Sequence, residues 1–198
     1  QAGSLRPEEA AERLRLLPYE DLGFAKLDHH RELRTGFPEV VLGLGKTKDQ
    51  IVSILEGLAA WSDRVLVTRV DREVFDAARE RVPDVCYNPT ARAIYLDRRA
   101  GERKAGVAVV CAGTADLPVA EEAALTAELL GNQVDRYTDV GVSGIHRLFD
   151  TLEALAQARA IVAVAGMEGA LPTIVGGLVR APVIAVPTSV GYGANFQG

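Results

Sequence analysis

The regular alternation of apolar and helix-forming segments after residue 104 constrains the fold more than any other feature of the sequence. Apolar runs predict strands at 107–111, 133–138, 160–165 and 182–186. The segments with helical spacing between them predict helices at 117–130, 144–156 and 171–179. Strands that alternate with helices form parallel sheets through right-handed crossovers. Residues 104–198 are therefore predicted to form a three-layer α/β domain around a parallel sheet.

The preceding part of the chain is shorter and less regular. Its expected strands and helices lie at 39–44, 48–61, 64–69, 73–81 and 93–96, after a first helix at 7–17. Residues 24–36 show no clear period, and the charged segment 97–104 is typical of a linker. We predict a smaller α/β domain at 1–103, with the domain boundary in that linker.

Composition excludes several classes of protein. A net charge of -5 argues against a nonspecific nucleic-acid surface, and the two cysteines, Cys86 and Cys111, cannot build a disulfide framework or a metal site. The sequence holds no apolar run long enough to cross a bilayer and does not open with a signal segment. We expect a soluble cytoplasmic protein without nucleic-acid or membrane partners.

Four segments rich in glycine and small polar residues follow the predicted strands of the second domain. They are 112–116, 139–147, 166–172 and 187–193. Ligands of parallel sheets bind at the carboxyl ends of the strands, so these segments predict the binding edge. At 106–123 a buried strand, a small-residue turn and a helix start predict an anion-binding corner made of Gly113, Thr114, Ala115 and Asp116. Such a corner indicates a nucleotide ligand.

Several side chains at this edge suggest chemistry, and each has a structural alternative. Glu168 follows an apolar strand, where partial burial would suit it to proton transfer, or it is an ordinary carboxylate near a helix N-terminus. His146 and Arg147 offer an imidazole and a phosphate-binding guanidinium, or they are incidental charges in a helical turn. Cys111 ends a strand beside the corner, but a buried thiol that acts as a small hydrophobic group is the favoured interpretation.

The amino-terminal part holds two further candidates. Gly43-Leu-Gly-Lys-Thr47 follows a strand and precedes a helix, but Val40 stands where the phosphate-binding loop of ATPases needs a glycine. Two interpretations of this segment remain: an ordinary turn, and a turn whose Lys46 touches a ligand phosphate. The Asp28-His-His30 segment suggests metal ligands or general bases, with surface solvation as the alternative, because adjacent histidines point in different directions.

Together these motifs resemble those of the LarB family, which acts in nickel-pincer nucleotide biosynthesis. The resemblance rests on 111–123, 139–147, 165–172 and 186–193, and on 24–31 and 36–47 in the amino-terminal part. The half after Lys104 is also similar to PurE, the aminoimidazole ribonucleotide carboxylase. The resemblance implies a PurE-like carboxyl-terminal domain and a homo-oligomer, an octamer by similarity to PurE.

The resemblance implies a double reaction with nicotinic acid adenine dinucleotide and CO2 as partners. The pyridinium ring is carboxylated at C5, and hydrolysis of the phosphoanhydride releases AMP and leaves pyridinium-3,5-biscarboxylic acid mononucleotide. A pyridinium carbon is too electron-poor to attack CO2, so a cysteine thiolate adds to the ring before a base removes the C5 proton. The family's cysteine lies after the Gly-Tyr-Gly loop at 191–193, and neither Cys86 nor Cys111 matches its motif. Either a further segment carries that cysteine, or this piece is an inactive truncation. We expect a chain that ends at Gly198 to bind the dinucleotide without carboxylating it.

The resemblance also assigns site residues by their positions. The expected catalytic residues are Glu168, Asp116 and His146. The expected binding residues are Gly113, Thr114, Ala115, Arg147, Gly166, Met167, Gly169, Ala170, Leu171, Pro172, Gly191, Tyr192, Gly193, Lys46, Asp28, His29 and Arg31. No tightly bound cofactor is expected, no metal ligand is assigned, and Mg2+ is considered only as a companion of the dinucleotide phosphates. A PurE-like ribonucleotide carboxylase or mutase and a noncatalytic nucleotide-binding module are the alternatives.

Overall fold

The computed structural model describes residues 19–99 and 101–189, and the chain divides into two compact units. Of the described residues, unit 1 comprises 19–89 and 93–99, and unit 2 comprises 90–92 and 101–189. The helix expected at 7–17 lies outside the described residues. Within the described ranges, no helix is both long and apolar enough to span a bilayer.

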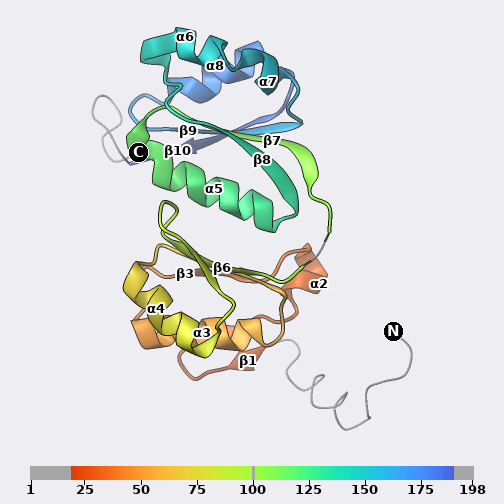
Figure 1. The fold of residues 1–198 in the computed structure, drawn as a ribbon, viewed down its shortest axis with the longest axis vertical. Helices are drawn as coiled ribbons and strands as arrows, with labels where there is room; N and C mark the ends of the chain where they lie inside the picture. The colour runs from red at the N-terminus through yellow and green to blue at the C-terminus, as the bar shows by residue number, and fades with distance from the viewer. Residues whose placement is uncertain (1–18, 100, 190–198) are drawn as a thin grey trace. The chain divides into compact units, whose positions relative to one another are not determined.

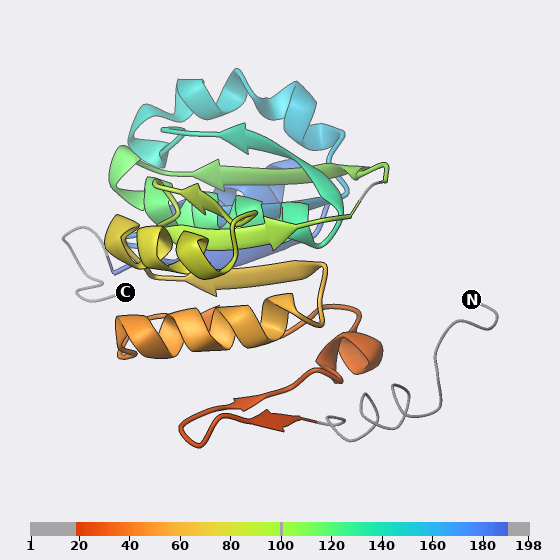
Figure 2. The ribbon, with the colours of Figure 1, turned by 60° about the horizontal axis from the view of Figure 1, so that its bottom comes forward.

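Unit 1 is built on a four-stranded mixed sheet. Its elements in chain order are β1 (Glu20–Asp21), β2 (Lys26–Leu27), α2 (Arg31–Thr35), β3 (Val40–Leu42), α3 (Lys48–Ala59), β4 (Arg64–Thr68), α4 (Arg72–Arg81), β5 (Cys86–Asn88) and β6 (Ala93–Asp97). The strand order is β3-β4-β6-β5, with β3 parallel to β4 and the other two pairs antiparallel. Helices α3 and α4 share one buried core with the sheet, and Figure 2 shows the separate β1-β2 pair beyond α3.

The segment 24–36, in which no regular structure was expected, contains β2 and α2. β2 pairs with β1, and Leu27 is buried so closely against Gly57 of α3 that a Cβ there would lie 2.4 Å from Leu27 Cδ1. A strand of two residues carries no periodic signal, so its pairing and burial decide its conformation. β5 was also not expected; it forms because its three residues pair with β6.

Unit 2 contains the parallel sheet that the sequence predicts. Its elements in chain order are β7 (Lys104–Cys111), the 3-10 turn η1 (Thr114–Asp116), α5 (Leu117–Leu129), β8 (Asn132–Tyr137), the 3-10 turn η2 (Val142–Gly144), α6 (Ile145–Phe149), α7 (Leu152–Ala156), β9 (Ala160–Ala165), α8 (Ala170–Leu178) and β10 (Val183–Pro187). The strand order is β10-β9-β7-β8, and all three pairs are parallel. The prediction of a parallel α/β domain after a smaller α/β region is confirmed.

Helices cover both faces of this sheet, as Figure 1 shows. Val109 and Cys111 of β7 face α5 through one core, whereas Ala108 and Val110 belong to the core shared with α6, α7 and α8. This alternation follows from the two-residue period of a strand. A strand buried on both faces is apolar throughout, which is why 107–111 is a continuous apolar run.

The single helix expected at 144–156 is two short helices, α6 and α7. Thr151 stands between them, and both its backbone N–H and its hydroxyl donate to the carbonyl of Leu148, at 3.0 and 2.8 Å. A threonine side chain that bonds a nearby carbonyl competes with the helical hydrogen-bond pattern. The apolar spacing runs through both helices, so the pattern alone does not reveal the break.

The strand order creates a crevice at one end of the sheet. The chain runs from β7 outward to β8, then crosses to the other side of β7 to form β9 and β10. The loops that follow β7 and β9 therefore lead to helices on opposite faces. Ligands of open parallel sheets bind at such a reversal, beyond the carboxyl ends of the strands.

Candidate active site

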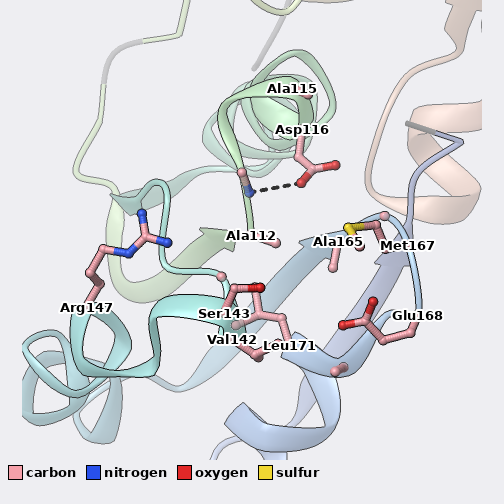
Figure 3. A pocket seen from close by; sticks show the side chains of 14 residues that line it. Ala112, Ala115, Asp116, Val142, Ser143, Arg147, Ala165, Met167, Glu168 and Leu171 are labelled. Atoms are coloured by element: carbon pink, nitrogen blue, oxygen red, sulfur yellow. Dashed lines mark hydrogen bonds between the residues drawn. The ribbon is translucent and has the colours of Figure 1, made fainter. Parts of the chain in front are cut away.

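A pocket of about 300 Å3 lies at the carboxyl ends of β7, β8 and β9 in unit 2. It is lined by Ala112, Gly113, Ala115, Asp116, Gly141, Val142, Ser143, Arg147, Ala165, Gly166, Met167, Glu168, Ala170 and Leu171. Figure 3 shows that Asp116, Arg147 and Glu168 reach it from three different segments. The small residues that the sequence places after these strands leave room between the loops, so the expected binding edge is a real cavity.

The loop after β7 closes on itself through Asp116. Gly113 is extended, residues 114–116 form the 3-10 turn, and α5 begins with Leu117 and Pro118. The backbone N–H of Gly113 donates to Oδ2 of Asp116 at 3.0 Å. This N–H belongs to the corner that was expected to bind a phosphate, but in this structure it binds a carboxylate of its own loop.

The side chain of Asp116 also accepts a hydrogen bond from Thr188, a residue distant in sequence. Its Oδ1 accepts a hydrogen bond of 2.6 Å from the hydroxyl of Thr188, and the two residues are only 6% and 4% exposed. The N–H of Thr188 donates to Ala165 at the end of β9, 3.0 Å away. Both oxygens of Asp116 thus have protein partners, and the residue joins the loops that follow β7 and β10.

The loop after β8 positions Arg147. The N–H of Val140 donates to the carbonyl of Cys111 at 3.1 Å, and a Cβ on Gly141 would lie only 2.6 Å from the carbonyl oxygen of Ala112. Glycine is therefore needed where the loops after β7 and β8 touch. Arg147 on α6 forms an ion pair with Asp139 and lines the pocket.

His146 does not line the pocket, although it precedes Arg147 directly. Successive residues of an α-helix point about 100° apart, so the two side chains of α6 cannot share one direction. His146 is exposed. The sequence expectation that both residues face the same cleft is met only by Arg147.

The loop after β9 presents Glu168. Gly169 donates to Gly166 at 3.0 Å to close a turn, and both Met167 and Gly169 have positive φ angles, 53° and 64°. Glu168 stands at the apex of this turn and is exposed, so the partial burial expected from the preceding strand is absent. In Figure 3 its carboxylate extends toward Ser143 and Leu171.

The other expected residues of unit 2 fall into two groups. Thr114, Gly169 and Pro172 belong to the same loops and helix starts but are not among the lining residues. Gly191, Tyr192 and Gly193 lie outside the described residues. The residues that individual sequence assignments missed are Ala112, Gly141, Val142, Ser143 and Ala165, all of which lie in or beside loops expected at the edge.

Lys46 lies in unit 1, where its Nζ donates to the carbonyl of Leu42 at 2.8 Å. Thr47 caps α3 and forms a capping box with Gln50. A Cβ on Gly43 would lie 2.4 Å from Cγ1 of Val70. The glycine, lysine and threonine of this segment thus have structural roles in a strand-to-helix turn.

Asp28, His29 and Arg31 also lie in unit 1. Asp28 accepts two hydrogen bonds from Arg34, at 3.1 and 2.5 Å, and the hydrogen bond from Arg34 lowers the pKa of Asp28. The side chain of His29 is 3% exposed, bonds Glu20 through Nε2 at 2.9 Å and packs on Trp61. Arg31 is exposed. His30 has its Nδ1 3.1 Å from Nη1 of Arg34, so all three residues of the Asp-His-His pattern have partners within unit 1.

The two cysteines differ in exposure. Cys111 has no exposed surface, and burial raises the pKa of its thiol. Cys86 is exposed on β5 of unit 1. Across residues 19–99 and 101–189, no three His, Cys, Asp or Glu side chains gather in a way that could hold a metal ion.

Comparison with known proteins matches each unit to a known domain family. Residues 19–98 match the LarB/PurE-like N-terminal domain, and residues 106–196 match the AIR carboxylase domain. An uncharacterized protein of Methanocaldococcus jannaschii is 38% identical over 204 residues, which cover 98% of this chain and 80% of that protein. The pocket described above lies within the segment that matches AIR carboxylase. The chain therefore belongs to the LarB family, in which a PurE-like AIR carboxylase domain follows the LarB N-terminal domain.

Proposed function

We propose that this protein carboxylates the pyridinium ring of nicotinic acid adenine dinucleotide at C5 and hydrolyses the phosphoanhydride to release AMP. One observation carries the proposal: an exposed carboxylate, Glu168, and a guanidinium, Arg147, line one pocket in the AIR carboxylase domain of a LarB-family chain. Membership of the PurE/LarB family implies a carboxylase-type role. The LarB N-terminal domain ahead of the AIR carboxylase domain supports the dinucleotide, and not a ribonucleotide, as the proposed substrate.

The pocket supports the binding of part of the dinucleotide. A volume of about 300 Å3 is at the lower end of ligand pockets, so it suits the nicotinate nucleotide half better than the whole molecule. Ala112, Val142 and Leu171 offer apolar surface to a flat ring. Arg147 offers N–H donors to a phosphate oxygen.

Glu168 is the proposed base for the C5 proton. A thiolate adds to the ring, C5 donates its electron pair to CO2, Glu168 takes the C5 proton, and the ring recovers its aromatic electrons as the thiolate leaves. Cys111 is a poor candidate for the thiolate, since it is fully buried and burial raises the pKa of its thiol. We assign the nucleophile to neither Cys86 nor Cys111.

The test separates the two half-reactions. The 198-residue chain, and the natural protein with any residues that it has beyond 198, are incubated with the dinucleotide and 13C-bicarbonate, and the label and AMP are measured separately. Glu168→Gln should lower label incorporation at least about a hundredfold while the dinucleotide still binds. Glu153 is an exposed glutamate on α7, so Glu153→Gln is the matched control and should incorporate label at the rate of the parent protein. Near-normal incorporation by Glu168→Gln would remove Glu168 from the chemistry.

A ribonucleotide carboxylase is the second candidate, because the match to AIR carboxylase covers the whole described pocket. The same assay with aminoimidazole ribonucleotide separates the two. Carboxylation of that substrate in preference to the dinucleotide would favour this candidate. Binding of either ligand without any turnover would favour a noncatalytic nucleotide-binding module.

A further inference from the structure

We propose that Asp139 and Gly144 are positioning residues that hold the guanidinium of Arg147 at the pocket so that it binds a phosphate group of the ligand. The proposal rests on the proposed function only in taking a nucleotide as the ligand; it requires no particular reaction. Three observations on the loop after β8 support it: an ion pair, a close packing contact, and anchoring of the loop that carries both.

The first observation is the ion pair. Nη1 of Arg147 donates to Oδ2 of Asp139. Asp139 has a positive φ of 59°, a conformation that side chains other than glycine, asparagine and aspartate rarely adopt. Asp139 and Arg147 are 51% and 39% exposed, and ion pairs as exposed as this one add little to fold stability. The pair therefore contributes little to the stability of the fold. Its position beside the pocket favours a role in holding Arg147 for a ligand.

The second observation is the contact with Gly144. A Cβ at this position would lie 2.7 Å from Nε, 2.9 Å from Nη2 and 3.1 Å from Cζ of Arg147. The guanidinium therefore lies directly on the Cα of Gly144. The φ of Gly144 is -126°, outside the left-handed region, so a side chain here would act by displacing the guanidinium and not through the backbone conformation.

The third observation is the anchoring of the loop. The residue after Asp139, Val140, bonds the carbonyl of Cys111 at the end of β7, and Gly144 donates to Gly141 at 3.0 Å. Gly141 in turn touches the carbonyl of Ala112, as described above. Asp139 and Gly144 thus belong to a loop whose backbone is fixed to the end of β7, an inner strand of the sheet.

Holding an arginine in place before the ligand arrives removes an entropic cost of binding. A long side chain that is immobilised only on binding weakens affinity by roughly threefold to tenfold. Asp139 and Gly144 are expected to prevent that loss. The penalty for removing them should fall on ligands that carry the phosphate, because only those ligands use the guanidinium.

The experiment compares two probes that differ only in the phosphate, nicotinic acid mononucleotide and nicotinic acid riboside, by calorimetry without CO2. Asp139→Asn keeps a residue that tolerates the positive φ, and Gly144→Ala adds one methyl group that must displace the end of Arg147. Each should weaken mononucleotide binding about threefold to tenfold and riboside binding less than about twofold. Either change should have no further effect when Arg147→Gln is already present.

Asp150→Asn is the matched control, since Asp150 is an exposed aspartate at the end of the same helix, and it should leave both affinities unchanged. Equal losses for the two probes would overturn the proposal, because they would indicate a general disturbance of the loop. Tighter mononucleotide binding by Asp139→Asn would overturn it as well, because Asp139 would then compete with the phosphate. A parent protein that does not prefer the mononucleotide would also overturn it. Failure of the parent protein to carboxylate the dinucleotide, with these binding differences intact, would count against the proposed function alone.

Discussion

Thr188 donates a 2.6 Å hydrogen bond to the buried carboxylate of Asp116, and the two residues stand 72 positions apart in the chain. The bond joins the ends of β10 and β7, at the edge where the pocket lies. Together with the N–H of Gly113, it gives each oxygen of Asp116 a donor. The loop after β7 is therefore held in shape by the residue that directly follows β10, the last described strand of the sheet.

Removing the Thr188 hydroxyl should destabilise unit 2. Thr188→Val leaves Oδ1 of Asp116 buried without this donor, which costs about 1–3 kcal/mol of unfolding free energy. Denaturant unfolding measures the change. Thr188→Ser keeps the hydroxyl and should lose clearly less unfolding free energy than Thr188→Val. Equal losses for the two variants would mean that the methyl group of Thr188, and not its hydroxyl, matters.

A larger side chain at Gly113 should fill part of the pocket. Gly113 has a φ of -138°, which valine accepts, and a Cβ there would lie 3.7 Å from the nearest neighbouring atom, Oδ2 of Asp116. Gly113→Val should therefore fold but bind the nucleotide at least about tenfold more weakly in a titration. Gly176→Val on α8, where a Cβ meets open space, is the control. Unchanged affinity in a folded Gly113→Val variant would place the ligand elsewhere.

The two cysteines should react at very different rates. Cys86 is exposed and should be alkylated readily by iodoacetamide, whereas Cys111 is buried and burial raises the pKa of its thiol, so less reactive thiolate forms near pH 8. Mass spectrometry should find one rapid modification, which Cys86→Ser removes, and a second only after denaturation. Rapid labelling of Cys111 in the folded protein would reopen its candidacy as the nucleophile.

The Asp28–Arg34 pair should make unit 1 sensitive to acid. The hydrogen bond from Arg34 lowers the pKa of Asp28 in the folded state, so the stabilisation is present above about pH 4 and is lost as the pH falls through the lowered pKa. Asp28→Asn should therefore be less stable than the parent at neutral pH, with the difference shrinking in acid. Fluorescence of the single tryptophan, Trp61, reports unfolding of unit 1. Asp63→Asn, at an exposed aspartate, should show no comparable change in pH dependence.

Much of unit 2 follows from local pattern. The continuous apolar runs of β7 and β9 predict strands buried on both faces, and their alternation with helices predicts the parallel sheet. The small residues after each strand predict where the pocket lies. These features depend on neighbours in sequence and on burial, which a pattern of apolar and polar residues records directly.

The detailed site depends on partners that are distant in sequence, and only the tertiary structure decided it. The sequence suggested an anion-binding corner at residues 113–116, but the N–H of Gly113 in that corner binds Asp116, which is held in turn by Thr188. It suggested a partly buried Glu168, but a tight turn exposes this residue. It also suggested that His146 faces the cleft, but successive residues of α6 point in different directions and only Arg147 lines the pocket. Residue type and spacing fix which groups are near an edge, whereas their orientation follows from packing and hydrogen bonds between loops that meet only in the folded sheet.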